Sequence, residues 1–178
     1  MASHIASLIM EAMNAECCQN FAGPKHTLVD FHRMMTRLVE MEDSQYSYRN
    51  VLAAYTSSGI LAGICVAYDG AKLHQLRRRF YEAALEAFGI DYTGMTDETE
   101  DGEFYIDSLA VSSNFRGKGI ASQLLQATIE RGAELGIPTV GLLVDKGNPK
   151  AEALYQRLGF VYVNDSTWGL ESKIMCRR

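Results

Sequence analysis

The stretch "NFRGKGIASQLL", residues 114–125, constrains the fold more than any other part of the sequence. It joins "EFYIDSLAV" at residues 103–111, an apolar run with strand character, to a helical pattern that continues to about Leu135. The apolar face of that helix carries Ile120, Leu124, Thr128 and Leu135. A strand, a glycine turn and a helix in direct succession are typical of proteins in which helices pack back onto a sheet.

The turn itself combines two glycines with two cations, in the order Arg116, Gly117, Lys118 and Gly119. Backbone N–H groups at a helix N-terminus are unpaired and carry the positive end of the helix dipole, so they can bind an anion such as phosphate. A Walker loop is excluded because Ile120 follows the second glycine, and the spacing also fits no dinucleotide-binding fingerprint. By itself, the turn fits a phosphate site and a plain strand-to-helix connection equally well.

The remaining sequence predicts further helices and strands. Two opening helices are expected, at 6–13 and from Thr27 to about residue 41, with Thr27 as N-cap and Asp30 three residues on. Asn148 and Pro149 predict another helix start, because Asn caps helices and Pro fits the first turn. The other predicted elements are a β-hairpin at 48–68, a helix at 72–88, strands at 138–144, 160–163 and 168–176, and a helix at 150–159.

Composition limits the classes of function. The 178 residues are 47% hydrophobic, which suits a single domain over residues 1–178. A formal net charge of −5 argues against a nucleic-acid partner, because such proteins draw affinity from cations that face phosphates. No segment reaches the roughly 18 consecutive apolar residues of a membrane span, so we expect no membrane partner. The four cysteines and four histidines show no metal-site spacing, and the cysteines suit buried, reduced thiols. We therefore expect no metal and a cytoplasmic location.

Three consecutive arginines, Arg77, Arg78 and Arg79, raise the alternative of a phosphate patch on the helix at 72–88. At about 100° per residue their side chains fan around the helix, and nearby glutamates offset them, which favours a solvated face. The acidic segment at 91–103 has little to bury. It is expected to be a mobile loop whose field could attract a cationic substrate.

Together, "DSLAVSSNFRGKGIASQLL" and "NPKAEALYQRLGF" resemble the GNAT family of N-acetyltransferases. The resemblance is specific between about residues 103 and 162. It implies an α/β fold in which a mixed, splayed β-sheet carries helices on both faces, and acetyl-CoA as cosubstrate. The positions that match the first family block are Arg116, Gly119 and Ala121, and those that match the second are Asn148, Ala151, Tyr155, Gly159 and Phe160.

Carried over residue by residue, the resemblance implies two parts of an acetyl-CoA site. The strand would offer main-chain groups of Leu109, Ala110 and Val111 to the pantetheine arm, since a strand whose neighbour diverges has unpaired N–H and C=O groups. The pyrophosphate would be held by Arg116, Gly117, Lys118, Gly119, Ile120 and Ala121. Asn148 would reach the arm from the other side, although its role as an N-cap is an equally good interpretation.

Amine acetylation needs a base, because a primary alkylamine with a pKa near 10 is mostly protonated at neutral pH. Side chains alternate along a strand, so Glu103, Tyr105, Asp107, Leu109 and Val111 are expected on one face unless a bulge intervenes. At about 3.3 Å per residue, Asp107 lies about 7 Å from Leu109 and Glu103 about 20 Å, so Asp107 is the first candidate base and Glu103 the alternative. It could equally be an ordinary hydrogen-bonded strand carboxylate.

The other reacting groups are expected close by. A strand N–H, such as that of Leu109, would stabilise the oxyanion. Tyr155 is the candidate acid for the departing thiolate of the cofactor, and its alternative role is a packed helical aromatic. The acceptor is expected to be a small-molecule amine. A peptide α-amine is the alternative, weakened because relatives that acetylate a ribosomal protein N-terminus carry a glutamate where this chain has Leu143.

Three points stay open at the level of the sequence. The chain starts almost inside a helix, whereas family members usually begin with a strand, so one sheet edge is undefined. A non-catalytic acetyl-CoA sensor and a plain structural domain are alternatives to an enzyme. The oligomeric state is also undetermined, and a homodimer is one of the states that the sequence allows.

Overall fold

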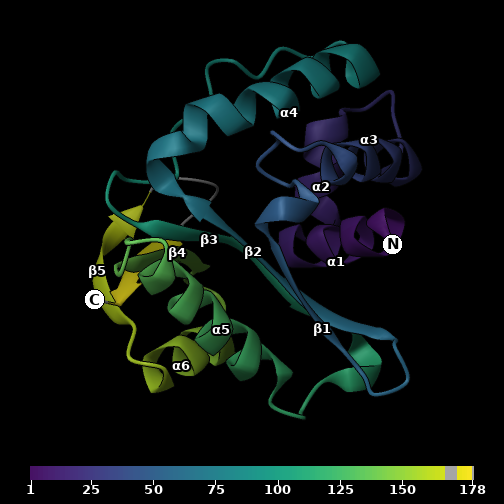
Figure 1. Cartoon of the computed structure of the whole chain (residues 1–178). Coiled ribbons are helices and arrows are strands. Elements are labelled where there is room, and N and C mark those ends of the chain that lie inside the picture. Colours follow the sequence, from purple (N-terminus) through teal and green to yellow (C-terminus); the bar gives the residue numbers. More distant parts are fainter. Residues whose placement is uncertain (167–171, 178) are drawn as a thin grey trace.

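The computed structural model describes residues 1–166 and 172–177 of the chain. Its centre is a six-stranded sheet in the order β1-β2-β3-β4-β6-β5 (Figure 1). All neighbouring strands are antiparallel except β3 and β4, which are parallel, so the sheet is mixed as expected. The strands are β1 (Val51–Tyr55), β2 (Leu61–Asp69), β3 (Phe104–Val111), β4 (Val140–Asp145), β5 (Val161–Ser166) and β6 (Ser172–Arg177).

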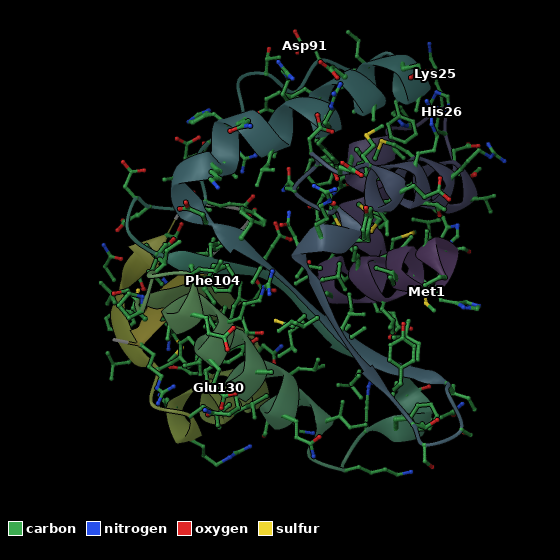
Figure 2. The ribbon with its side chains drawn as sticks, in the orientation of Figure 1. Met1, Lys25, His26, Asp91, Phe104 and Glu130 are labelled. Atoms are coloured by element: carbon green, nitrogen blue, oxygen red, sulfur yellow. The ribbon has the colours of Figure 1, made fainter. Side chains whose placement is uncertain are left out.

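Helices cover both faces of the sheet, which confirms the expected architecture (Figure 1). One apolar core lies between the sheet and α1 to α4, and a second lies between the sheet and α5 and α6. Phe104 of β3, labelled in Figure 2, belongs to the second core. The helices are α1 (Ala2–Met13), α2 (Ala15–Ala22), α3 (Leu28–Glu40), α4 (Leu73–Phe88), α5 (Ile120–Glu134) and α6 (Pro149–Arg157).

Capping residues set the helix boundaries that the sequence predicts. Thr27 accepts from the backbone N–H of Asp30 and the Asp30 side chain accepts from the N–H of Thr27, which completes the capping box at the start of α3. Asn148 caps α6 through Oδ1, 3.2 Å from the N–H of Ala151. The helix α2 was not predicted, because Asn14 with φ 70° interrupts the helical periodicity directly after α1.

β3 and β4 diverge after a short paired stretch. Their register runs only from Phe104 opposite Val140 to Ile106 opposite Leu142, and β4 then continues against β6. Within the described residues, no strand pairs with this edge of β3 beyond Ile106. The predicted strand at 168–176 is present as β6 from residue 172, and residues 168–171 lie outside the described part of the chain.

The prediction of a solvated arginine face on α4 is wrong for one of the three arginines. Arg77 has a side chain that is only 1% exposed, whereas Arg78 is 63% exposed. Arg77 is buried because Glu98, from the segment that was expected to be mobile, lies against it with 6% of its side chain exposed. The segment 91–103 therefore carries a buried charge partner rather than only solvated carboxylates.

Candidate functional site

The glycine turn leads directly into α5 and leaves the start of that helix uncapped. Gly117 and Gly119 have φ values of 73° and 76°, in the left-handed region that a side chain disfavours by about 1–2 kcal/mol. Gly119 is the N-cap residue, and among the described residues no side chain caps α5. The first N–H groups of α5 are therefore available to an anion.

A hollow of about 210 Å³ lies at this turn. Its lining includes six of the residues expected at the cofactor, namely Val111, Arg116, Gly117, Gly119, Ile120 and Ala121. Leu154 and Arg157 of α6 also line it and were not predicted. They lie three residues apart on one helix face, so helical spacing would have paired them, but only the fold brings α6 beside the turn.

The two cations of the turn have partners within the chain. Arg116 is 64% exposed, its Nε lies 3.0 Å from the carbonyl oxygen of Val111, and its Nη2 lies 3.6 Å from a carboxylate oxygen of Glu11. The ammonium of Lys118 lies 5.5 Å from the ring centre of Phe115. Both side chains are weakly held at the surface, so they can turn toward an anion in the hollow.

The end of β3 presents one free edge beside this turn. Leu109 and Val111 pair with Cys65 and Gly63 of β2, while the other edge faces the gap left by β4. Ala110, between them, packs into the core on the α1 side of the sheet. The unpaired edge is where a ligand amide could complete the strand's hydrogen bonds.

A β-bulge at Asp107 overturns the expected arrangement of side chains on β3. Val66 lies opposite Ser108 and the next residue of β2 lies opposite Ile106, so Asp107 is left without a partner in the register. As a result Leu109 packs into the core beside α5. Asp107 instead contacts Tyr68, whose ring packs on Tyr105. The predicted shared face of Asp107, Leu109 and Val111 is therefore wrong.

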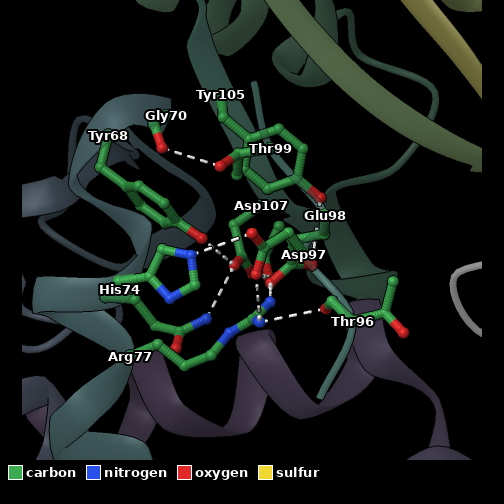
Figure 3. A network of polar contacts seen from close by, with 12 residues as sticks. Tyr68, Gly70, His74, Arg77, Thr96, Asp97, Glu98, Thr99, Tyr105 and Asp107 are labelled. Atoms are coloured by element: carbon green, nitrogen blue, oxygen red, sulfur yellow. Dashed lines mark hydrogen bonds and ion pairs between the residues drawn. The ribbon is translucent and has the colours of Figure 1, made fainter. Parts of the chain in front are cut away.

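The carboxylate of Asp107 is surrounded by uncharged donors (Figure 3). Its oxygens accept from the hydroxyl of Tyr68 at 2.8 Å, from the hydroxyl of Ser108 at 2.8 Å and from Nε2 of Gln45 at 3.3 Å. Burial raises the pKa of Asp107, and these hydrogen bonds oppose that rise. Asp107 is thus a carboxylate with an increased affinity for a proton, as a base needs.

Glu98 is a second buried carboxylate of this site and was missed from the sequence (Figure 3). Its oxygens accept from Nη2 of Arg77 at 2.6 Å and from the hydroxyl of Tyr105 at 3.2 Å. Burial, followed by the negative charge of Asp107, raises the pKa of Glu98 to about 7, against the opposing charge of Arg77. The only available signal was the neighbourhood of arginines and glutamates, which sequence patterns cannot pair across 21 residues.

Glu103 does not join this network. Its side chain is buried and accepts from the backbone N–H of Glu100 at 2.9 Å, which closes the turn before β3. A Cβ atom on Gly141 of β4 would overlap the carboxyl group of Glu103. Only a glycine at position 141 leaves room for the Glu103 side chain. We interpret Glu103 as a structural carboxylate rather than a second base.

Tyr155 lies on α6, and its ring centre is 5.9 Å from that of Phe160. Burial, followed by the charges of Cys65 and Asp145, raises the pKa of Tyr155 to about 12, so its hydroxyl stays protonated. Asn148, seven residues earlier, uses Oδ1 as the helix cap, and its amide NH₂ is left for another partner. The N-cap interpretation of Asn148 is therefore confirmed, and it does not exclude a ligand contact.

The comparison with protein families agrees with this layout. Residues 87–160 match the model of the acetyltransferase (GNAT) family. Within these residues the chain is similar to the GNAT family. A solved structure of an acetyltransferase, 24% identical, superimposes with a TM-score of 0.82 and covers 99% of this chain and 94% of that chain. The GNAT fold expected from the sequence is thereby confirmed.

Curated relatives match over shorter segments. A mycothiol acetyltransferase of Propionibacterium freudenreichii subsp. shermanii is 36% identical over 43% of this chain and 24% of its own length. The N-alpha-acetyltransferase MAK3 of Arabidopsis thaliana is 40% identical over 38% of this chain and 35% of its own length. The matched part thus spans about a quarter to a third of these relatives.

Two further observations concern metals and membranes. In the part of the chain that the structure describes, no group of three or more His, Cys, Asp or Glu side chains is arranged to hold a metal ion. Among the described helices, none combines the length and the apolar character needed to cross a bilayer.

Proposed function

We propose that the protein transfers the acetyl group of acetyl-CoA directly to a primary amine. The observation that carries this proposal is the continuity of three features along β3: the base-like carboxylate of Asp107 at the bulge, the free edge from Leu109 to Val111, and the uncapped helix start beyond the turn. Each feature meets one requirement of the reaction, namely proton removal, thioester placement and phosphate binding.

The cofactor would bind along the free edge of β3. Its pyrophosphate would accept from the N–H groups around Gly119, with Arg116 and Arg157 as charge partners at the hollow. The amides of its pantetheine arm would pair with the free edge of β3 at Leu109 to Val111. This places the thioester toward Asp107, about 7–13 Å along the strand from those residues at about 3.3 Å per residue.

The chemistry follows from the proton balance. Asp107 takes one proton from the bound ammonium, and the nitrogen lone pair attacks the thioester carbon. A backbone N–H of the strand stabilises the oxyanion. As the C–S bond breaks, Tyr155 donates a proton to the sulfur and regains one from the new amide nitrogen. The products are the N-acetylated amine and free coenzyme A, and Asp107 releases its proton to solvent.

A peptide or protein α-amine is the alternative acceptor. It is favoured by the similarity to an N-alpha-acetyltransferase. It is disfavoured by Leu143, which stands where ribosomal N-terminal acetyltransferases carry a glutamate. A module that binds acetyl-CoA without turning it over is the alternative outside enzymes.

The direct test is acetyl-CoA-dependent release of free thiol in the presence of polyamines, amino acids, aminoglycosides or short peptides. Tyr155→Phe is expected to lower kcat by about 100-fold with the best acceptor, since a positioned acid contributes at least that much. Tyr162→Phe is the matched control, because Tyr162 is 52% exposed on β5. Cofactor binding without thiol release in any mixture would favour the sensor instead.

A second prediction concerns Arg157, the cation of the hollow that the sequence did not reveal. Arg157→Gln is expected to raise the Kd of coenzyme A about fivefold, the effect of one exposed ion pair, and this increase should shrink at high salt. Calorimetric titration at two salt concentrations measures both. Arg131→Gln, a change in the last turn of α5, should leave the Kd unchanged. Equal effects of both changes would exclude a specific contact.

A further inference from the structure

Gln45 carries the one buried side-chain oxygen or nitrogen that lacks a hydrogen-bond partner within the described residues. The residue follows α3, is only 3% exposed, and donates from Nε2 to Asp107 at 3.3 Å. The atom without a partner is Oε1, on the same amide group. An unpaired buried acceptor costs about 1–3 kcal/mol, so such an atom calls for a functional explanation.

The orientation of this amide is fixed by its neighbour. A flipped Gln45 would place its oxygen against the carboxylate oxygen of Asp107, and two acceptors repel at that distance. The unpaired oxygen therefore cannot be removed by exchanging the two amide atoms. Oε1 belongs to the same amide group as Nε2, which lies 3.3 Å from the Asp107 carboxylate. A single donor group that binds at this place can therefore hydrogen-bond both Oε1 and Asp107.

The site has more negative than positive charge, which favours the binding of one cation. Asp107 and Glu98 are two carboxylates, and Arg77, whose guanidinium is buried, hydrogen-bonds Glu98. The hydrogen bonds that Asp107 accepts come from Tyr68, Ser108 and Gln45, all uncharged. Asp107 is partly exposed whereas Gln45 is buried, so an amine would approach Oε1 of Gln45 from the side of Asp107. A group with positive charge and at least two N–H donors satisfies Asp107 and Oε1 of Gln45 together.

We propose that Gln45 is an acceptor-binding residue: the substrate's protonated primary amino group binds between Asp107 and Oε1 of Gln45. This inference rests on the proposed function and specifies its acceptor. One N–H of the ammonium gives its proton to Asp107, and a second N–H stays hydrogen-bonded to Oε1 of Gln45. The lone pair that is freed on the nitrogen is thereby oriented for attack. Quaternary amines are excluded, because they have charge but no N–H.

The test uses the full chain with coenzyme A bound, and follows the melting temperature with n-butylamine or butyltrimethylammonium added. Butylamine is expected to raise the melting temperature of the wild-type protein, and butyltrimethylammonium is not. In Gln45→Met, which keeps the side-chain length but has no amide, the response to butylamine should disappear. With an acceptor that is turned over, the same change should raise KM for the amine about tenfold or more, with less effect on kcat.

Gln19→Met is the matched control. The Nε2 of Gln19 donates to the carbonyl oxygens of Gly23 and His26 at the end of α2, so this change should lower the melting temperature and leave the amine response intact. Gln45→Met should itself melt close to wild type, since the unpaired oxygen is removed with the amide.

Distinct results overturn the inference and the proposed function. An unchanged amine response or amine KM in Gln45→Met, or equal responses of the wild type to both amines, would exclude Gln45 as an acceptor-binding residue while acetyl transfer still stands. A failure of the wild type to bind coenzyme A or to release thiol would instead refute the proposed function.

Discussion

Asp107→Asn is expected to lower kcat for amine acetylation by about 100- to 10,000-fold, the usual contribution of a positioned general base. Asparagine can still accept the hydrogen bond from Tyr68, so the bulge and the Kd of coenzyme A should be preserved. Steady-state thiol release, with a calorimetric titration of coenzyme A alongside, separates loss of chemistry from loss of binding.

Glu103→Gln is the control for this experiment, because Glu103 closes a turn and lies outside the Asp107 network. It should leave kcat within a few-fold of wild type. If Glu103→Gln abolished turnover and Asp107→Asn did not, the assignment of the base would be reversed.

The pH profile of acetyl transfer adds an independent check. Since burial raises the pKa of Asp107 and the carboxylate is the active form, kcat/KM should fall as pH drops through a value above that of an exposed aspartate.

At a pH well above 7, where Glu98 is ionised, Arg77→Met is expected to lower the free energy of unfolding by about 3–5 kcal/mol, the usual cost of leaving one member of a buried ion pair without its partner. Arg77 and Glu98 are 1% and 6% exposed, so neither charge is relieved by water in the folded protein. Chemical denaturation of wild type and variant measures the difference. Arg78→Met, at a side chain that is 63% exposed, should change the unfolding free energy by less than about 0.5 kcal/mol.

The pH dependence of this loss has a definite sign. Glu98 already has a pKa raised to about 7, and removal of Arg77 takes away an opposing charge that lowers it. In the variant, the pKa of Glu98 is therefore higher still, and the difference from wild type should shrink as the pH falls from that higher pKa toward about 7 and be small below it. The double variant with Glu98→Leu should recover much of the loss. A loss that stays constant with pH would mean that packing of the arginine stem, rather than its charge, stabilises this site.

Local signals explain why much of the fold could be predicted. The capping box at Thr27, the Asn148–Pro149 helix start and the glycine turn before α5 act over a few residues, and each is present where the sequence predicts it. The helix α2 was missed for the same reason, because a one-residue break at Asn14 resembles a helix end and is followed by only eight helical residues.

The candidate site was predicted only where its residues are neighbours in the chain. The family blocks led to the turn at 116–121, which lines the hollow, whereas Arg157 enters that hollow only through the packing of α6. The face of Asp107 was mispredicted because a β-bulge depends on the register with β2, and one strand's sequence does not contain its partner's register.

By itself, the sequence determined the mixed α/β architecture, the position of the anion-binding turn and the resemblance to the GNAT family. Each of these depends on the periodicity and spacing of residues that are close together in the chain. Only the tertiary structure decided which charges are buried together. Arg77, Glu98, Asp107 and Gln45 come from four separate segments, and their pairing depends on how α4 and the loop at 91–103 pack against β3. Burial strengthens the interactions among these groups and makes them specific. Burial arises only when several segments pack together, so no single segment of the sequence predicts it.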